Sequence, residues 1–217
     1  MKVAIFLVFL FAYSLCVDEG IDVSAWQGNI NWANVKRAGK KFAILRAGTG
    51  KGNKDKYFEQ NYQNAKAQGI PVGVYWYSYA NSGAEAKNEA ALCHNILKGK
   101  KFEYPIYIDI EEKSIFQKNI ANDLAINFCS YMESNKYFCG IYSSLYYYNS
   151  YFNKEVKAKY SLWVAQWGPD HCTYDGPFGV WQYSSTGSVS GISGNVDLDK
   201  SYSDFPTIIK NAHLNGY

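Results

Sequence analysis

Apolar residues along the chain alternate between short dense runs and longer segments with helical spacing. Short apolar and aromatic runs bounded by Gly, Pro or Asn are typical of buried strands. Segments with apolar residues three or four positions apart that stop at a Gly are typical of helices. We therefore predict strands at 21–26, 42–47, 71–79, 105–111 and 138–143, and helices at 32–38, 57–68, 84–97 and 120–134.

The pattern changes after about residue 160. The predicted strands at 161–167, 178–183 and 195–198 are joined by segments too short for full helices, and 205–214 is a last amphipathic helix. Repeated strand–helix units predict a parallel sheet with right-handed crossovers. Since no repeat or linker interrupts the chain, we predict one α/β domain. It is a single irregular (β/α) barrel of about eight strands with roughly five flanking helices, its last strands joined by loops.

The N-terminal segment indicates export. Residues 1–16 contain one lysine, an apolar run, and small residues at the −3 and −1 positions of a cleavage site before Val17. These features predict a secretory signal peptide and a mature domain at 17–217. No other apolar run approaches the roughly 20 residues of a membrane-spanning helix. We expect a secreted protein, with the phagosomal or lysosomal lumen as a further destination, and no membrane span.

Cleavage leaves four cysteines, Cys93, Cys129, Cys139 and Cys172. An even number in an exported chain suggests two disulfides, and three pairings are formally available. We predict Cys93 with Cys129, because both lie in helical segments flanking the strand at 105–111, and Cys139 with Cys172. No Cys-x-x-Cys occurs and the His residues are scattered, so we predict no metal site.

Charge and aromatic content narrow the class of partner. The net charge is +3, which a cleaved signal peptide lowers by one, and this does not indicate nucleic-acid binding. The chain has 20 Tyr, 12 Phe and 6 Trp, an excess that suits stacking on sugar rings, although core packing accounts for most of them. Candidates for stacking, with rim or core packing as the alternative role, are Tyr75, Tyr77, Trp167 and Trp181. We expect no cofactor.

Acidic residues mark the predicted strand ends. Asp109 and Glu111 end the strand at 105–111 and point the same way, since side chains alternate along a strand. Neighbouring acids raise each other's pKa, as glycosidic acid catalysis requires. Asp22 and Asp197 lie in the first and last strands, which are neighbours in a closed barrel. The alternatives are a helix cap for the first pair and hydrogen bonds to seam amides for the second.

Seven short motifs cover nearly all of the mature chain. They are GIDVSAWQG at 20–28, FAILRAGTG at 42–50, GVYWY at 73–77, YIDIE at 107–111, LWVAQW at 162–167, WQY at 181–183 and GNVD at 194–197. The clearest is YIDIE, where the two acids stand one residue apart. In this order the motifs resemble those of glycoside hydrolase family 25, the Chalaropsis-type lysozymes.

The resemblance implies a barrel with an acidic groove and cleavage of the β-1,4 bond after N-acetylmuramic acid in bacterial peptidoglycan. By motif, Glu111 matches the proton donor and Asp109 the second catalytic carboxylate. Asp22 and Asp197 match acids that flank the substrate. One departure is Trp76, which stands where many relatives have His. It bears on substrate preference and leaves the reaction unchanged.

The stereochemistry stays open. Carboxylates at i and i+2 of a strand have Cα atoms roughly 6.5–7 Å apart, from which retaining and inverting arrangements can both be reached. A third route uses the 2-acetamido group of the substrate as nucleophile, with Asp109 holding the amide. The resemblance favours this retaining route.

Two rival functions are a chitin hydrolase and a glycan-binding protein without turnover. Tyr107 and Pro105 occupy places where a chitinase signature has Asp, and Glu111, the acid that a silent protein tends to lose, is present. We therefore predict an antibacterial or digestive lysozyme, a monomer with peptidoglycan as its partner.

Overall fold

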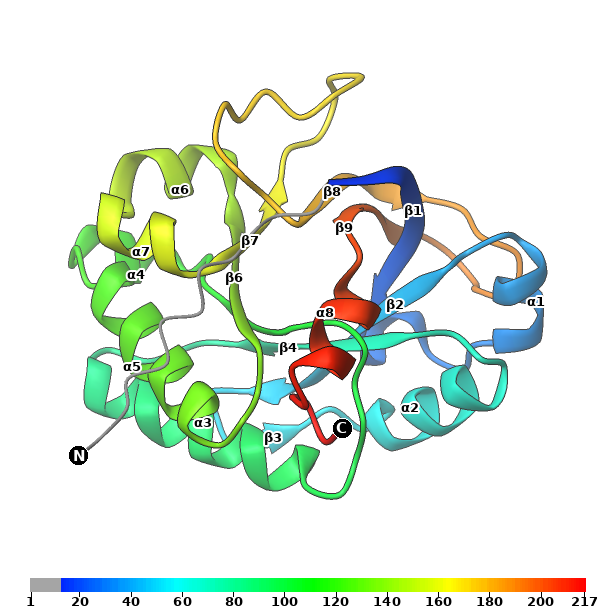
Figure 1. The fold of residues 1–217 in the computed structure, drawn as a ribbon, viewed down its shortest axis with the longest axis horizontal. Coiled ribbons are helices and arrows are strands. Elements are labelled where there is room, and N and C mark those ends of the chain that lie inside the picture. The colour runs from blue at the N-terminus through cyan, green and yellow to red at the C-terminus, as the bar shows by residue number, and fades with distance from the viewer. Residues whose placement is uncertain (1–12) are drawn as a thin grey trace.

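The computed structural model describes residues 13–217, so the predicted signal peptide falls largely outside the described residues. Nine strands form one sheet, and the pairing of its first strand with its second in the chain closes it into a barrel (Figure 1). Around the barrel the order is β1 (Tyr13–Val23), β9 (Val196–Ser203), β8 (Val180–Gly187), β7 (Ser161–Ala165), β6 (Cys139–Ser144), β5 (Ile106–Asp109), β4 (Val72–Tyr77) and β2 (Phe42–Thr49). The short β3 (Asn53–Lys54) extends the end of β2, and the predicted barrel is confirmed.

Strand direction explains how the two ends of the chain build one site. From β1 through β2, β4, β5, β6 and β7 to β8, neighbouring strands are parallel. β9 runs antiparallel to both β8 and β1, because a loop without a crossover helix joins it to β8. The beginning of β9 therefore lies beside the end of β1, at the edge where the parallel strands finish.

Helices cover the outside and one end of the barrel (Figure 1). They are α1 (Trp32–Arg37), α2 (Phe58–Ala67), α3 (Gly83–Leu97), α4 (Lys113–Gln117), α5 (Ala121–Ser134), α6 (Leu145–Tyr151), α7 (Lys154–Lys159) and α8 (Phe205–Asn211), with a 3₁₀ turn η1 (Ala25–Gln27). The five predicted helices are present. The prediction missed α4, α6 and α7, which are too short to show helical periodicity. No helix within residues 13–217 combines the length and apolarity needed to cross a membrane.

The core has two layers because strand residues alternate between the faces of the sheet. Phe42 and Ile44 of β2 pack inside the barrel, whereas Leu45 packs outside under the helices. Phe205 and Ile209 of α8 join the inner layer and close the end of the barrel at which the parallel strands begin. The opposite end is left open for polar side chains.

All four cysteines of the predicted mature domain are free thiols in the structure, so neither predicted disulfide is present. Cys139 begins β6, whereas Cys172 follows the end of the parallel neighbour β7, so these two lie at opposite ends of the barrel. Cys93 and Cys129 are buried on α3 and α5. The sulfur of Cys129 faces the carbonyl oxygen of Gly140 at 3.7 Å, and that of Cys139 faces the same oxygen at 3.8 Å.

Candidate active site

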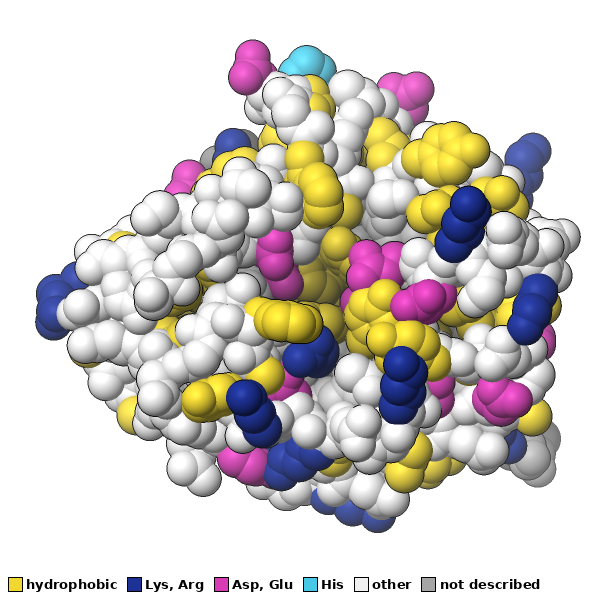
Figure 2. Space-filling model, turned by 180° about the vertical axis from the view of Figure 1, so that it is seen from behind, with side chains coloured by type: hydrophobic (Ala, Val, Ile, Leu, Met, Phe, Trp, Pro, Cys, Tyr) yellow, Lys and Arg dark blue, Asp and Glu magenta, His cyan; other side chains and the backbone are white. Residues whose placement is uncertain are grey.

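Acidic side chains gather at the open end of the barrel. Asp22 on β1 pairs directly with Asp197 on β9, and Asp109 is the last residue of β5. Asp22 and Asp109 are only 4% and 3% exposed. Figure 2 shows a hollow in this face, with acidic side chains beside it and hydrophobic side chains on its floor and rim. The predicted proximity of the first and last strands is confirmed.

Glu111 lies two residues beyond Asp109, past the end of β5. The residue keeps exposed surface at the mouth of the barrel. Desolvation raises the pKa of its carboxyl group, and the negative charges of Glu112 and Asp197 act in the same direction. The Tyr77 hydroxyl, which donates to Glu112, also lies close to the Glu111 carboxyl and lowers its pKa. Glu111 is thus an accessible carboxyl group that retains its proton to higher pH than an ordinary glutamate.

Asp109 is buried beside Glu111. Its Oδ1 has no hydrogen-bond partner among the described residues. Burial raises its pKa well above the usual range, and so does the charge of Glu111, while the guanidinium of Arg46 lowers it. Arg46 is held in turn by Asp55, whose Oδ2 accepts from Nε at 2.8 Å and lies 2.7 Å from Nη2. A fixed cation therefore favours the charged form of Asp109.

Asp22 is held by a chain of hydrogen bonds across the mouth. Gln182 Nε2 donates to Asp22 Oδ2 at 2.8 Å. The amide oxygen of Gln182 accepts from the Tyr142 hydroxyl at 3.0 Å and from Trp167 Nε1 at 3.1 Å. Because two donors occupy the amide oxygen, the amide nitrogen must face Asp22.

Two of the predicted aromatic residues line the mouth from β4. Tyr75 is half-buried, with its ring edge against Trp163 at 5.9 Å between centroids. Tyr77 is also half-buried, and its hydroxyl donates to Glu112 Oε1 at 2.8 Å. Trp76 between them faces outward and donates to Glu89 of α3 at 3.1 Å. This departure from the family motif therefore lies behind the site.

The other two predicted aromatic residues, Trp167 and Trp181, lie in different environments. Trp167 is 56% exposed, so it can meet a ligand while its indole N–H anchors it to Gln182. Trp181 is 1% exposed and packs in the outer layer, where its N–H donates to the carbonyl oxygen of Gln166. The proposed stacking role of Trp181 is wrong, because alternation along β8 turns Gln182 into the barrel in its place.

The class of the protein follows from its match to a known protein family. A family model described as "Glycosyl hydrolases family 25" matches residues 21–192. The chain belongs to glycoside hydrolase family 25. It is therefore a glycoside hydrolase, in agreement with the resemblance of its motifs.

This family 25 enzyme is similar to proteins named as lysozymes. It is 33% identical over 199 residues to "Lysozyme M1" of Streptomyces globisporus, covering 84% of this chain and 67% of that protein. It is 30% identical over 185 residues to "Autolytic lysozyme" of Clostridium acetobutylicum, covering 84% of this chain and 55% of that protein. The chain thus spans between half and about two thirds of these relatives.

Solved structures show the same fold. The bacterial lysozyme from Streptomyces coelicolor has a TM-score of 0.76 and 31% identity, covering 92% of this chain and 98% of that one. The autolysin LytC from Streptococcus pneumoniae, solved with a synthetic peptidoglycan ligand, has a TM-score of 0.78 and 25% identity, covering 86% of this chain and 47% of that one.

Several residues in the site of this family 25 enzyme were not predicted from the sequence. Arg46 occupies the inward position that follows Phe42 and Ile44, and a charge on that face of an apolar strand was a usable signal. Asp199 follows Asp197 by two positions, which places both on one face of β9. The remaining missed residues are Asp55, Glu112, Tyr142, Trp163 and Gln182.

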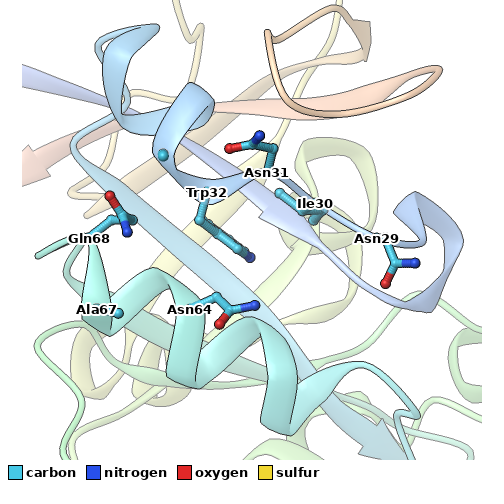
Figure 3. Close-up of a pocket in the computed structure, with 8 residues that line it drawn as sticks. Asn29, Ile30, Asn31, Trp32, Asn64, Ala67 and Gln68 are labelled. Atoms are coloured by element: carbon cyan, nitrogen blue, oxygen red, sulfur yellow. The ribbon is translucent and has the colours of Figure 1, made fainter.

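The enzyme also has an open groove away from the acids. Its volume is about 470 Å³, and it lies outside the barrel between α1 and α2 (Figure 3). Amide side chains line much of it, and none of the acids at the mouth does. The lining residues are Asn29, Ile30, Asn31, Trp32, Ala33, Asn64, Ala67 and Gln68. Across residues 13–217, no group of three His, Cys, Asp or Glu side chains is placed to hold a metal ion.

Proposed function

We propose that this family 25 enzyme is a secreted lysozyme. It hydrolyses the β-1,4 bond between N-acetylmuramic acid and N-acetylglucosamine in bacterial peptidoglycan. The observation that carries the proposal is the placement of Asp109 and Glu111 at the open mouth of the barrel, facing Asp22 and Asp197. The lysozyme names of two relatives and the peptidoglycan ligand of LytC support this choice of substrate.

Glu111 is the general acid. It must be protonated before it can donate to the glycosidic oxygen, and desolvation raises its pKa in the required direction. Asp109 and Glu111 repel each other when both are ionised. Arg46 favours the charge on Asp109, whereas the charged neighbours of Glu111 are the acids Glu112 and Asp197. The proposed mechanism requires the proton of the pair on Glu111, and Arg46 favours the charge on Asp109 against the burial that raises the pKa of Asp109.

Asp109 acts as the second carboxylate. Its unpartnered Oδ1 is an acceptor that can hold the N–H of the substrate's 2-acetamido group while the acetamido oxygen attacks the anomeric carbon. The negative charge also stabilises the oxocarbenium-like transition state. This substrate-assisted route retains the anomeric configuration. NMR of the first product tests it, and an inverted anomer would contradict it.

The remaining residues of the mouth bind the sugars. Asp22 and Asp197 accept hydrogen bonds from hydroxyl or acetamido groups, since both are acids at the open mouth of the barrel. Tyr75, Tyr77 and Trp167 supply half-buried or exposed rings for stacking on sugar faces.

The site of action is outside the cytoplasm of the producing cell. Residues 1–16 have the pattern of a signal peptide, so the mature enzyme starts at Val17 and acts against bacteria, in defence or digestion. Secretion and delivery to a phagosomal or lysosomal lumen both follow from this route. N-terminal sequencing of the exported protein tests the cleavage, and light scattering tests the expected monomer.

Clearing of isolated bacterial cell walls by the mature protein tests the reaction. The expected result is clearing by the wild type and none by Glu111→Gln, with products that end in reducing N-acetylmuramic acid by mass spectrometry. Release from chitin oligosaccharides without action on walls would identify a chitin hydrolase. Binding to walls without hydrolysis by the wild type would identify a glycan-binding protein.

A further inference from the structure

The turn that follows β1 holds a tryptophan out in the solvent. Trp26, in η1 (Ala25–Gln27), is 85% exposed, the largest value among the large hydrophobic side chains of residues 13–217. Tryptophan is a highly buried residue type on average, because its ring carries more apolar area than most side chains. The mechanism proposed for the mouth does not use Trp26, so its exposure needs a separate explanation.

Hydrogen bonds fix the backbone of this turn. Ser24 Oγ accepts from the backbone N–H of Trp26 at 3.2 Å, and Gln27 Oε1 accepts from the backbone N–H of Ser24 at 2.9 Å. Gly28 ends the turn with a φ of 62°, a left-handed conformation that glycine adopts without strain. Trp26 therefore stands on a fixed backbone, which lowers the conformational entropy that binding a ligand would cost.

The same turn is joined to the residues that build the mouth. The backbone N–H of Ala25 donates at 2.9 Å to Asp55 Oδ2, the oxygen that also accepts from Arg46. Gln27 Nε2 donates at 3.3 Å to the carbonyl oxygen of Asn195, the residue just before β9. The turn is therefore fixed at the rim of the mouth, next to the seam where β1 meets β9.

The indole N–H of Trp26 is free to bind a ligand, since no hydrogen bond recorded among residues 13–217 uses it. Every other tryptophan of the chain donates its indole N–H to an acceptor within the protein. The pairs are Trp32 with Asn61, Trp76 with Glu89, Trp163 with Asp199, Trp167 with Gln182 and Trp181 with the carbonyl oxygen of Gln166. Trp26 thus offers an apolar ring face and a polar donor together, which suits a sugar ring and its hydroxyl groups.

Exposed aromatic rings are concentrated at this end of the barrel. After Trp26, the most exposed are Tyr146 at 69% and Trp167 at 56%. The three residues follow the ends of the parallel strands β1, β6 and β7, which is the end where the acids gather. Because β1 and β6 lie on opposite sides of the barrel (Figure 1), the segments that carry Trp26 and Tyr146 leave it on opposite sides of the mouth. Rings on both sides of the acids fit a chain of several sugars.

We propose that Trp26 binds a sugar of the glycan strand at a subsite remote from the cleaved bond. Its ring stacks on the apolar face of the sugar, and its indole N–H donates to a hydroxyl or acetamido oxygen. A long strand gains this contact, whereas a short fragment that reaches only the acids does not. This inference rests on the proposed function, which supplies the glycan strand as the substrate.

Binding of glycan fragments to the Glu111→Gln enzyme tests the subsite without cleavage. The probes are peptide-free peptidoglycan fragments of one and of four disaccharide repeats, and nitrogen-15 NMR follows the indole N–H signals. We expect the long fragment to bind more tightly and to shift the signal of Trp26. Adding Trp26→Ala should lower the affinity for the long fragment about fivefold, the loss expected of one aromatic stacking contact, and leave the short fragment unaffected.

Two further variants separate the ring from other effects. Trp26→Phe keeps a ring without the donor, so it should recover part of the affinity lost in Trp26→Ala. Leu92→Ala is the matched control, because it removes an exposed apolar side chain from α3 on the outside of the barrel and should change neither affinity. Both Trp26 variants should keep the melting temperature of the parent enzyme, since the ring is exposed.

The outcomes distinguish this inference from the proposed function. An unmoved Trp26 signal, or an undiminished preference for the long fragment in Trp26→Ala, would overturn the subsite even if the wild type cleaves cell walls. A shifted Trp26 signal in a protein whose wild type cleaves no cell walls would contradict the proposed function alone.

Discussion

Asp22 on β1 and Asp197 on β9 lie directly opposite each other across the seam where the barrel closes. The two residues are far apart in the sequence and come together because β9 runs antiparallel to β1. Their pairing makes the seam part of the site, since β5 brings Asp109 to the same end of the barrel. The same strand pairing therefore closes the barrel and assembles the acidic mouth.

Glu111→Gln should abolish most of the activity and leave the fold intact. Gln has nearly the same shape but no proton to transfer, so kcat should fall by about 10²–10⁴-fold. The matched control is Glu112→Gln, because Glu112 is adjacent and accepts a hydrogen bond from Tyr77. The kcat of Glu112→Gln should stay within about tenfold of that of the wild type. A larger effect at Glu112 than at Glu111 would show that the wrong glutamate has been assigned.

Tyr77→Phe should shift the pH profile. The Tyr77 hydroxyl donates to Glu112 and also lowers the pKa of the neighbouring Glu111, so removing the hydroxyl raises the pKa of Glu111. A higher pKa keeps the acid protonated further into the alkaline range. The alkaline limb of kcat/KM should therefore move to higher pH. Tyr79→Phe is the control, because that ring packs against Tyr77 at 5.0 Å between centroids. An unmoved or acid-shifted limb in Tyr77→Phe would contradict the assignment.

The sequence predicts the acidic mouth better than its aromatic rim. Acids at strand ends can be placed from alternation and closure alone, which is why Asp22, Asp109 and Asp197 meet as expected. Alternation does not tell which face of a strand is inward when both faces are apolar. On β8 the predicted stacking candidate was Trp181, whereas in the structure Gln182 is the residue that faces inward.

The cysteines show a second limit of sequence analysis. An even number of cysteines in an exported chain suggests disulfides, but pairing depends on where each strand starts and ends. Cys139 and Cys172 are separated by the length of the barrel, which only the register of β6 and β7 reveals. The partner of Arg46 was also hidden from sequence analysis, because Asp55 lies in a loop that no pattern marks.

Arg46→Met should destabilise the enzyme. Asp55 is buried and would keep only the backbone N–H groups of Ala25 and Tyr57 as donors. Breaking a buried pair on one side costs about 2–4 kcal/mol of unfolding free energy, measured by urea denaturation. Lys54→Met is the matched control, since its pair with Glu59 is exposed and should contribute no more than about 1 kcal/mol. Equal losses in both variants would refute this account.

Protonation of Glu103 should lower the free energy of unfolding at acid pH. Burial alone would raise its pKa, but hydrogen bonds from Lys66, Tyr217 and the backbone N–H of Val72 outweigh it and lower the pKa. The folded state therefore binds its proton less readily than the unfolded chain. The stabilisation by ionised Glu103 is present above the pKa that its carboxyl group has in the unfolded chain. It disappears as the pH falls through the lower pKa of the folded state. Wild type should exceed Glu103→Gln by about 2 kcal/mol at pH 7, and this gap should close below pH 4. A constant gap across that range would exclude the ionised form as its source.

Two tryptophans from the same predicted set should behave in opposite ways. Trp167 is exposed at the mouth, so Trp167→Ala should raise KM about fivefold by removing a stacking surface, with little change in unfolding free energy. Trp181 is buried under the outer layer, so Trp181→Ala should cost about 3–5 kcal/mol of stability. Trp167→Phe separates stacking from anchoring, because it keeps a ring but cannot donate to Gln182. If Phe restores KM fully, the ring alone binds the sugar. If KM stays high, the bond to Gln182 is needed to hold the ring in place.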